Sequence, residues 1–85
     1  MKSYLVQIKT FEDDKEILIS AFWIDSISEY LRSIILCKEY NIPLVVNQSD
    51  DTIKEKYHSM EFLVDSIEYQ IGSEESIPCV RVYVI

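Results

Sequence analysis

The sequence predicts an α+β domain with one long helix packed on one face of a mostly antiparallel sheet. Two strand-like runs surround a short acidic turn, an amphipathic helix follows them, and the remaining apolar runs are again strand-like. The expected order is β-β-α-β-β-β, with a short extra helix near 49–57 as an option. The 85 residues are 48% apolar and contain no linker, so we treat 1–85 as a single domain.

The first two expected strands form a hairpin. Residues Tyr4 to Phe11 alternate, with apolar side chains on one face and Gln7 and Lys9 on the other. A polar turn, Glu12 to Lys15, separates them from a second alternating run, and this arrangement predicts a β-hairpin. In the second run we expect Ile17, Ile19, Ala21 and Trp23 on one face, and Leu18, Ser20 and Phe22 on the other.

The long helix is expected from about Ile27 to Tyr40. Ser26 and Glu29 have the spacing of a capping box, in which each side chain binds the other residue's backbone N–H. Asn41 can adopt the left-handed conformation that ends a helix. The buried stripe repeats at helical spacing and consists of Ile27, Tyr30, Leu31, Ile34 and Ile35.

The second half of the chain is expected to contain three strands. Leu44–Val46 is short, and Ser49 with Asp50 and Asp51 can cap a helical turn that continues to Lys56. The parity of the apolar residues shifts near Asp65, which predicts a β-bulge there. The long strand is expected at Met60–Ile71, a turn at Gly72–Ser76 and the last strand at Cys79–Ile85.

Charge and composition exclude several classes of function. A net charge of −7 argues against direct binding to nucleic acid or to an anionic membrane, because both need clustered Lys and Arg. The apolar runs are too short for a membrane span, and the first nine residues lack a secretory signal. Cys37 and Cys79 both lie in apolar stretches, so we expect buried free thiols and a cytoplasmic protein.

No catalytic or cofactor motif is visible. His58 lies in a polar segment without a partner nucleophile or an orienting carboxylate, and we interpret it as a surface histidine. Two distant cysteines do not make a zinc site, and one glycine does not make a phosphate-binding loop. We therefore expect no enzyme activity, no catalytic residues, no metal and no cofactor.

Two surfaces are candidates for binding a protein. The expected topology places both acidic turns at one end of the sheet. Their carboxylates would imitate a phosphate backbone and occupy the basic groove in which a partner protein binds nucleic acid. The alternative is that these turns are only solvated. The acidic set is Glu12, Asp13, Asp14, Glu16, Glu74 and Glu75.

The last strand is the second candidate, because it is apolar on both faces. It would contact a partner or a second copy of the chain, unless the segment Gln48–His58 covers it. The expected interface residues are Val80, Val82, Val84 and Tyr83.

These observations favour a small acidic inhibitor or adaptor whose partner is a protein, with a nucleic-acid-binding complex as the expected kind. In size, charge and Ile-rich composition the chain is similar to phage inhibitors of host defence, the anti-CRISPR proteins among them, although no motif assigns it to a family. The alternative is a structural module that forms a homodimer or a larger homo-oligomer.

Overall fold

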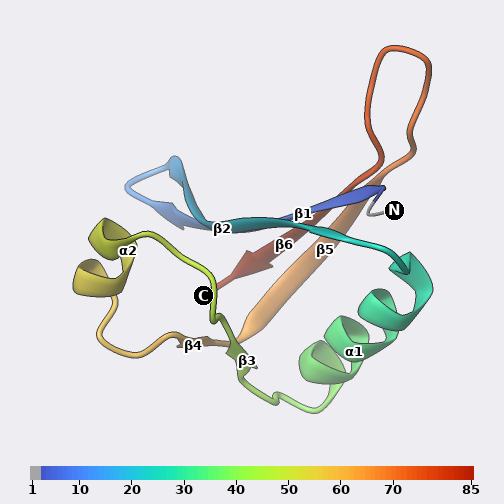
Figure 1. Cartoon of the computed structure of the whole chain (residues 1–85). Coiled ribbons are helices and arrows are strands. Elements are labelled where there is room, and N and C mark those ends of the chain that lie inside the picture. Colours follow the sequence, from blue (N-terminus) through green and yellow to red (C-terminus); the bar gives the residue numbers. More distant parts are fainter. Residues whose placement is uncertain (1–2) are drawn as a thin grey trace.

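The computed structural model describes residues 3–85, and Figure 1 shows the whole arrangement. A four-stranded sheet forms one layer, and the helices lie on one side of it. In chain order the elements are β1 (Tyr4–Glu12), β2 (Lys15–Ile24), α1 (Ile27–Glu39), β3 (Leu44–Val45), α2 (Asp51–Lys56), β4 (Glu61–Phe62), β5 (Val64–Gln70) and β6 (Cys79–Val84).

The main sheet has the strand order β2-β1-β6-β5. The outer pairs, β2 with β1 and β6 with β5, are antiparallel, whereas the central pair, β1 with β6, is parallel. The strands β3 and β4 form a separate two-stranded sheet. The predicted fold class, a mostly antiparallel sheet with one long helix on one face, is confirmed.

The β1–β2 hairpin closes through a two-residue turn. Glu12 pairs with Lys15, and the two residues between them have positive φ angles, 52° at Asp13 and 64° at Asp14. This backbone matches the right-handed twist of the strands, and aspartate tolerates the left-handed region better than most residues. The hairpin geometry therefore accounts for the two aspartates without any functional role.

A β-bulge in β2 changes which of its side chains face the core. The register shifts after the Ile8–Ser20 pair, so Ile19 is an extra residue in β2. Ile19 and Ser20 are consequently both buried. The alternation expected for β2 is therefore wrong. Leu18, Ala21 and Trp23 lie on the face away from the core. They pair there with Lys9, Gln7 and Leu5, respectively.

The boundaries of α1 agree with the prediction, but its N-terminal cap does not. Ser26 is the N-cap residue, yet its side chain makes no capping hydrogen bond. Both Ser26 and the first-turn Glu29 are exposed, so water can bind the free amides there. At the other end Asn41 has a φ of 53°, and the Ile42 amide donates to the Cys37 carbonyl over 3.0 Å, the pattern of a Schellman cap.

The long strand expected at Met60–Ile71 is divided in two. Its beginning is β4, which pairs with β3, and its remainder is β5, which pairs with β6. The predicted bulge at Asp65 is confirmed by a register shift between Val64 and Ser66. The short helix α2 is also confirmed, and Asp50 caps it by accepting the Ile53 amide over 2.9 Å.

The buried residues form one cluster between the sheet and the elements that cover it. Three of the four β6 side chains expected at a protein interface are part of this core: Val80 and Val82 are 0% exposed and Val84 is 2% exposed. The fourth, Tyr83, lies on the opposite face of the sheet. The prediction that the three valines form an open apolar face is therefore wrong. Ile53 and Tyr57, from the segment Gln48–His58, are among the partly buried residues that pack against the core cluster as a whole.

The two acidic turns lie at opposite ends of the sheet. Because β1 and β6 are parallel, Leu5 pairs with Cys79 where both strands begin. The 12–15 turn follows the end of β1, whereas the 71–78 loop precedes the start of β6, and Figure 1 shows the two far apart. The prediction of a single acidic pole is wrong for this reason.

The packing of α1 on the sheet can be tested at two adjacent residues, Ile34 and Ile35. Ile34 is 1% exposed whereas Ile35, expected in the same stripe, is 43% exposed. We expect Ile34→Ala to lower the free energy of unfolding by about 2–5 kcal/mol, because it leaves a cavity in the core. Ile35→Ala is the matched control and should cost less than about 1 kcal/mol. Urea unfolding followed by circular dichroism measures both, and equal losses would contradict the helix orientation.

Candidate functional site: the open face of the sheet

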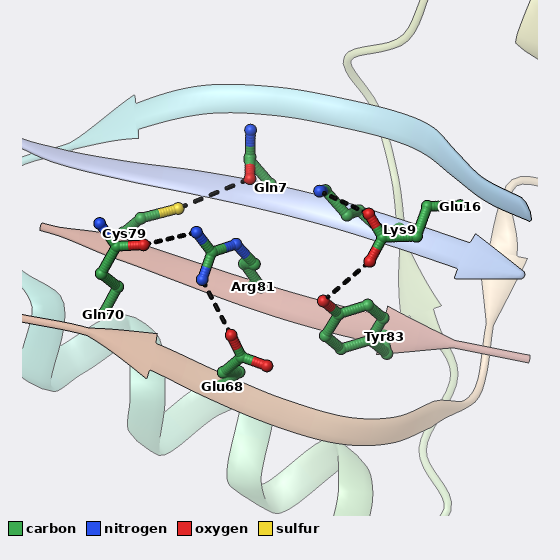
Figure 2. A network of polar contacts seen from close by, with 8 residues as sticks. All are labelled: Gln7, Lys9, Glu16, Glu68, Gln70, Cys79, Arg81 and Tyr83. Atoms are coloured by element: carbon green, nitrogen blue, oxygen red, sulfur yellow. Dashed lines mark hydrogen bonds and ion pairs between the residues drawn. The ribbon is translucent and has the colours of Figure 1, made fainter. Parts of the chain in front are cut away.

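One face of the main sheet is not covered by any helix of residues 3–85, and Figure 2 shows its polar centre with the helices behind the strands. Apart from the bulges in β2 and β5, its side chains alternate with the inward-facing ones along the strands. We call this surface the open face. Its residues are Leu5, Gln7, Lys9, Phe11, Glu16, Leu18, Ala21, Trp23, Ser66, Glu68, Gln70, Cys79, Arg81 and Tyr83.

Arg81 lies on β6 at the centre of the open face. Its guanidinium donates to a carboxylate oxygen of Glu68 over 2.9 Å and to the side-chain oxygen of Gln70 over 2.5 Å (Figure 2). Both acceptors lie on β5, where Glu68 pairs directly opposite Arg81. The forked geometry of arginine suits two acceptors on one neighbouring strand, so this side chain is held in one position.

A second group of polar contacts connects three strands at the other end of the open face. The Glu16 carboxylate accepts a hydrogen bond from the Lys9 ammonium and another from the Tyr83 hydroxyl, each over 3.2 Å (Figure 2). The hydrogen bond from Lys9 is the largest cause of a lowered Glu16 pKa. Burial, followed by the bond to Glu16, raises the pKa of the Tyr83 hydroxyl.

Aromatic side chains lie on both sides of this polar network. The rings of Phe11 and Tyr83 are stacked, with 5.5 Å between centroids and 9° between planes. Phe11 nevertheless remains 59% exposed, and Trp23 on β2 is 43% exposed. Leu18 is a further exposed apolar residue on this face. The open face therefore combines exposed apolar groups with a fixed polar centre.

The acidic residues named from the sequence are divided between two places. Glu12 contacts α2, where the Lys56 ammonium lies 2.6 Å from its carboxylate and the Tyr57 hydroxyl donates to it over 3.2 Å. The hydrogen bond from Lys56 is the largest cause of the lowered pKa of Glu12. The hairpin brings together Glu12, Asp13, Asp14 and Glu16, whereas Glu74 and Glu75 lie in the loop at the other end of the sheet.

The groups considered for chemistry are not assembled into a reactive site. His58 is exposed, as predicted, and Cys37 and Cys79 are free thiols, the first half-buried and the second buried. Within residues 3–85 there is no group of three or more His, Cys, Asp or Glu arranged to hold a metal ion. In the same part of the chain, no helix has both the length and the apolar character that a membrane span requires.

Sequence reasoning missed most of the open face. Gln7 and Lys9 are polar residues two positions apart in β1, so they lie on the same face of the strand. Arg81 is the charged residue within the apolar strand β6, and it pairs with Gln7 on that face. Together these positions indicate one polar sheet face. The stack of Phe11 on Tyr83 had no such signal, because it depends on β1 and β6 being parallel neighbours.

Comparisons of this chain with protein families, with curated proteins and with solved structures found no match.

The two lowered glutamate pKa values can be tested separately. We expect Lys9→Met to raise the pKa of Glu16 toward the ordinary value of 4.5, because the ammonium that stabilises the carboxylate is removed. Lys56→Met is the matched control and should raise the pKa of Glu12 alone. Carboxyl-detected NMR titration measures both values, and a Glu16 pKa that Lys9→Met leaves unchanged would contradict the contact.

The same contacts fix the sign of the pH dependence. A carboxyl group whose pKa is lower in the folded state contributes stability at pH values above its unfolded pKa. This contribution is lost as the pH falls below 4.5 and through the lowered values of Glu12 and Glu16. The acid unfolding of the Lys9→Met variant should therefore show a smaller loss of stability over this pH range than that of the wild type.

Proposed function

We propose that this chain is a protein-binding domain of the inhibitor or adaptor kind, and that it binds its partner protein through the open face. One observation carries the proposal: the polar side chains at the centre of this face are bonded to one another, while aromatic side chains beside them remain exposed. A partner protein that covers such a surface gains contacts with the aromatic groups and leaves few polar groups unpaired.

Because the polar groups of the open face are already paired, the free-energy penalty of covering them is smaller than for unpaired groups. A buried donor or acceptor without a partner destabilises a complex by about 1–3 kcal/mol. Arg81 already donates to Glu68 and Gln70, and Glu16 already accepts from two donors. A partner that covers these groups therefore leaves their hydrogen bonds in place.

The exposed aromatic residues supply the attractive part. Tryptophan, tyrosine and arginine are the residue types most often found at the energetic centre of protein interfaces. The open face offers Trp23, Tyr83 and Arg81, and Phe11 extends the apolar area beside Tyr83. Because the chain carries a net charge of −7, a partner protein of positive net charge is expected to associate with it faster, and salt should slow their association.

Two functions that the sequence suggested do not fit this structure. Imitation of a nucleic-acid backbone required the two acidic turns to add into one negative field, but these turns lie at opposite ends of the sheet. Oligomerisation through the last strand required Val80, Val82 and Val84 to be accessible, but all three are buried. We place the domain in the cytoplasm, and the two free thiols support this location.

Affinity capture with matched variants tests the proposal. The immobilised protein is incubated with a lysate of the organism from which the sequence comes, and the retained proteins are identified by mass spectrometry. We expect one basic protein to be retained, and Phe11→Ser together with Trp23→Ser to weaken its binding by at least about tenfold. Both side chains are exposed, so the variant should keep the fold.

Tyr40→Ser is the control, because Tyr40 is also aromatic and exposed but is the C-cap residue of α1, the helix that packs on the covered side of the sheet. It should leave the retained protein unchanged. Binding that is lost in Tyr40→Ser and kept in the Phe11 and Trp23 variant would place the interface on the helical layer and overturn the proposal. Retention of no protein by the wild type would overturn it as well.

A further inference from the structure

The outer side of α1 faces away from the sheet and carries exposed apolar side chains. Ile34 lies on the inner side of the helix and is only 1% exposed. Leu36 follows two residues later, which corresponds to about 200° of helical rotation, so it lies on the side away from the sheet. Leu36 is 50% exposed, and Tyr40, about one turn further along, is 68% exposed. α1 therefore presents an apolar strip to solvent.

Two side chains of opposite charge lie on one flank of this strip. Arg32 is about one turn before Leu36 and Glu39 is about one turn after it, and the helical repeat places both on the same flank. Both are exposed, and neither forms an ion pair within residues 3–85. Ser33 and Tyr40 occupy the other flank in the same way. We call these five residues, Arg32, Ser33, Leu36, Glu39 and Tyr40, the α1 outer face.

The segment that contains the α1 outer face is electrically balanced, unlike the rest of the chain. The whole chain has a net charge of −7. Residues 27–48 contain two acidic residues, Glu29 and Glu39, and two basic residues, Arg32 and Lys38, so their formal charge is zero. All of the excess negative charge consequently lies outside this segment. Two copies of the chain can therefore meet at the α1 outer face without bringing a surplus of carboxylates together there.

We propose that the α1 outer face binds a second copy of this chain, with the two α1 helices antiparallel and related by a two-fold axis at Leu36. In such a pair, a residue before Leu36 lies beside a residue that follows Leu36 at a similar distance in the other copy. Arg32 then lies beside Glu39 of the second copy, and the two-fold axis repeats this ion pair. On the other flank the Tyr40 ring covers Ser33 of the second copy. The two Leu36 side chains meet at the centre.

The order of the two charges selects both the occupant and its orientation. A parallel pair of helices would place like charges beside each other, Arg32 against Arg32 and Glu39 against Glu39. Only after rotation by half a turn is the surface complementary to itself, which is the property of a two-fold interface. The interface is small, so we expect a weak dimer with a Kd of about 10–100 μM. The open faces of both copies stay accessible, because the helices lie behind the strands (Figure 2).

Sedimentation equilibrium of the whole chain, from about 10 μM to about 1 mM, tests the dimer. We expect the mass to rise with concentration from that of one chain toward twice this value. Leu36→Glu should weaken the dimer by at least about tenfold, because it places two unpaired carboxylates at the centre of the interface. Leu18→Glu is the matched control, since Leu18 is 47% exposed but lies on the open face, and it should dimerise like the wild type.

A wild type that remains monomeric over the whole concentration range would overturn the proposal. Dimerisation that is lost in Leu18→Glu and kept in Leu36→Glu would place the interface on the open face, which would overturn it as well. Both substituted leucines are exposed, and circular dichroism checks that each variant keeps the fold.

An exchange of the two charges tests the antiparallel arrangement. Arg32→Glu alone and Glu39→Arg alone should each weaken the dimer by at least about fivefold, because each creates two contacts between like charges. The double variant, which carries both substitutions, should return the Kd to within about twofold of the wild-type value. An equal mixture of the two single variants should also associate, because both ion pairs of the heterodimer again join opposite charges.

The two outcomes that contradict this arrangement are equally specific. The first is a double variant that dimerises as weakly as either single variant. The second is a mixture of the single variants that associates no better than each of them alone. Either result would show that Arg32 and Glu39 do not face each other across the interface.

Discussion

The parallel pairing of β1 with β6 is the constraint on which the rest of the structure depends. It places the last strand in the middle of the sheet, with Val6 beside Val80 and Ile8 beside Val82, and all four side chains are at most 2% exposed. The same pairing directs β5 antiparallel to β1, and therefore the 71–78 loop lies away from the hairpin turn. One strand direction thus determines the core, the open face and the distribution of charge.

Local chemistry made most of the elements predictable. The acidic turn, the left-handed Asn41, the short helix capped by Asp50 and the bulge at Asp65 each follow from residues close in sequence. Topology was not predictable in the same way, because strand direction depends on contacts between the two ends of the chain. The bulge at Ile19 was also hidden, since extra residues in an apolar run do not interrupt its hydrophobic pattern.

The candidate site was missed for a related reason. A sequence with a net charge of −7 draws attention to its carboxylates, yet the open face is organised around the cations Lys9 and Arg81. Each of them is paired with a carboxylate from a neighbouring strand. The two members of each pair lie apart in the sequence, so the sequence shows no local cluster of charges at these positions. Only the strand order brings Phe11 onto Tyr83 and Glu16 between Lys9 and Tyr83.

The two halves of the covered face differ because different kinds of structure pack on them. Under the β5–β6 half, α1 presents a regular apolar stripe and Ile34 is almost fully buried. Under the β1–β2 half, the cover is the irregular segment that holds β3, β4 and α2, and α2 contains no fully buried residue. Short elements interdigitate less regularly with a sheet than a long helix does, and a pocket lined by Tyr30 and Leu44, among other residues, lies where these two kinds of cover meet.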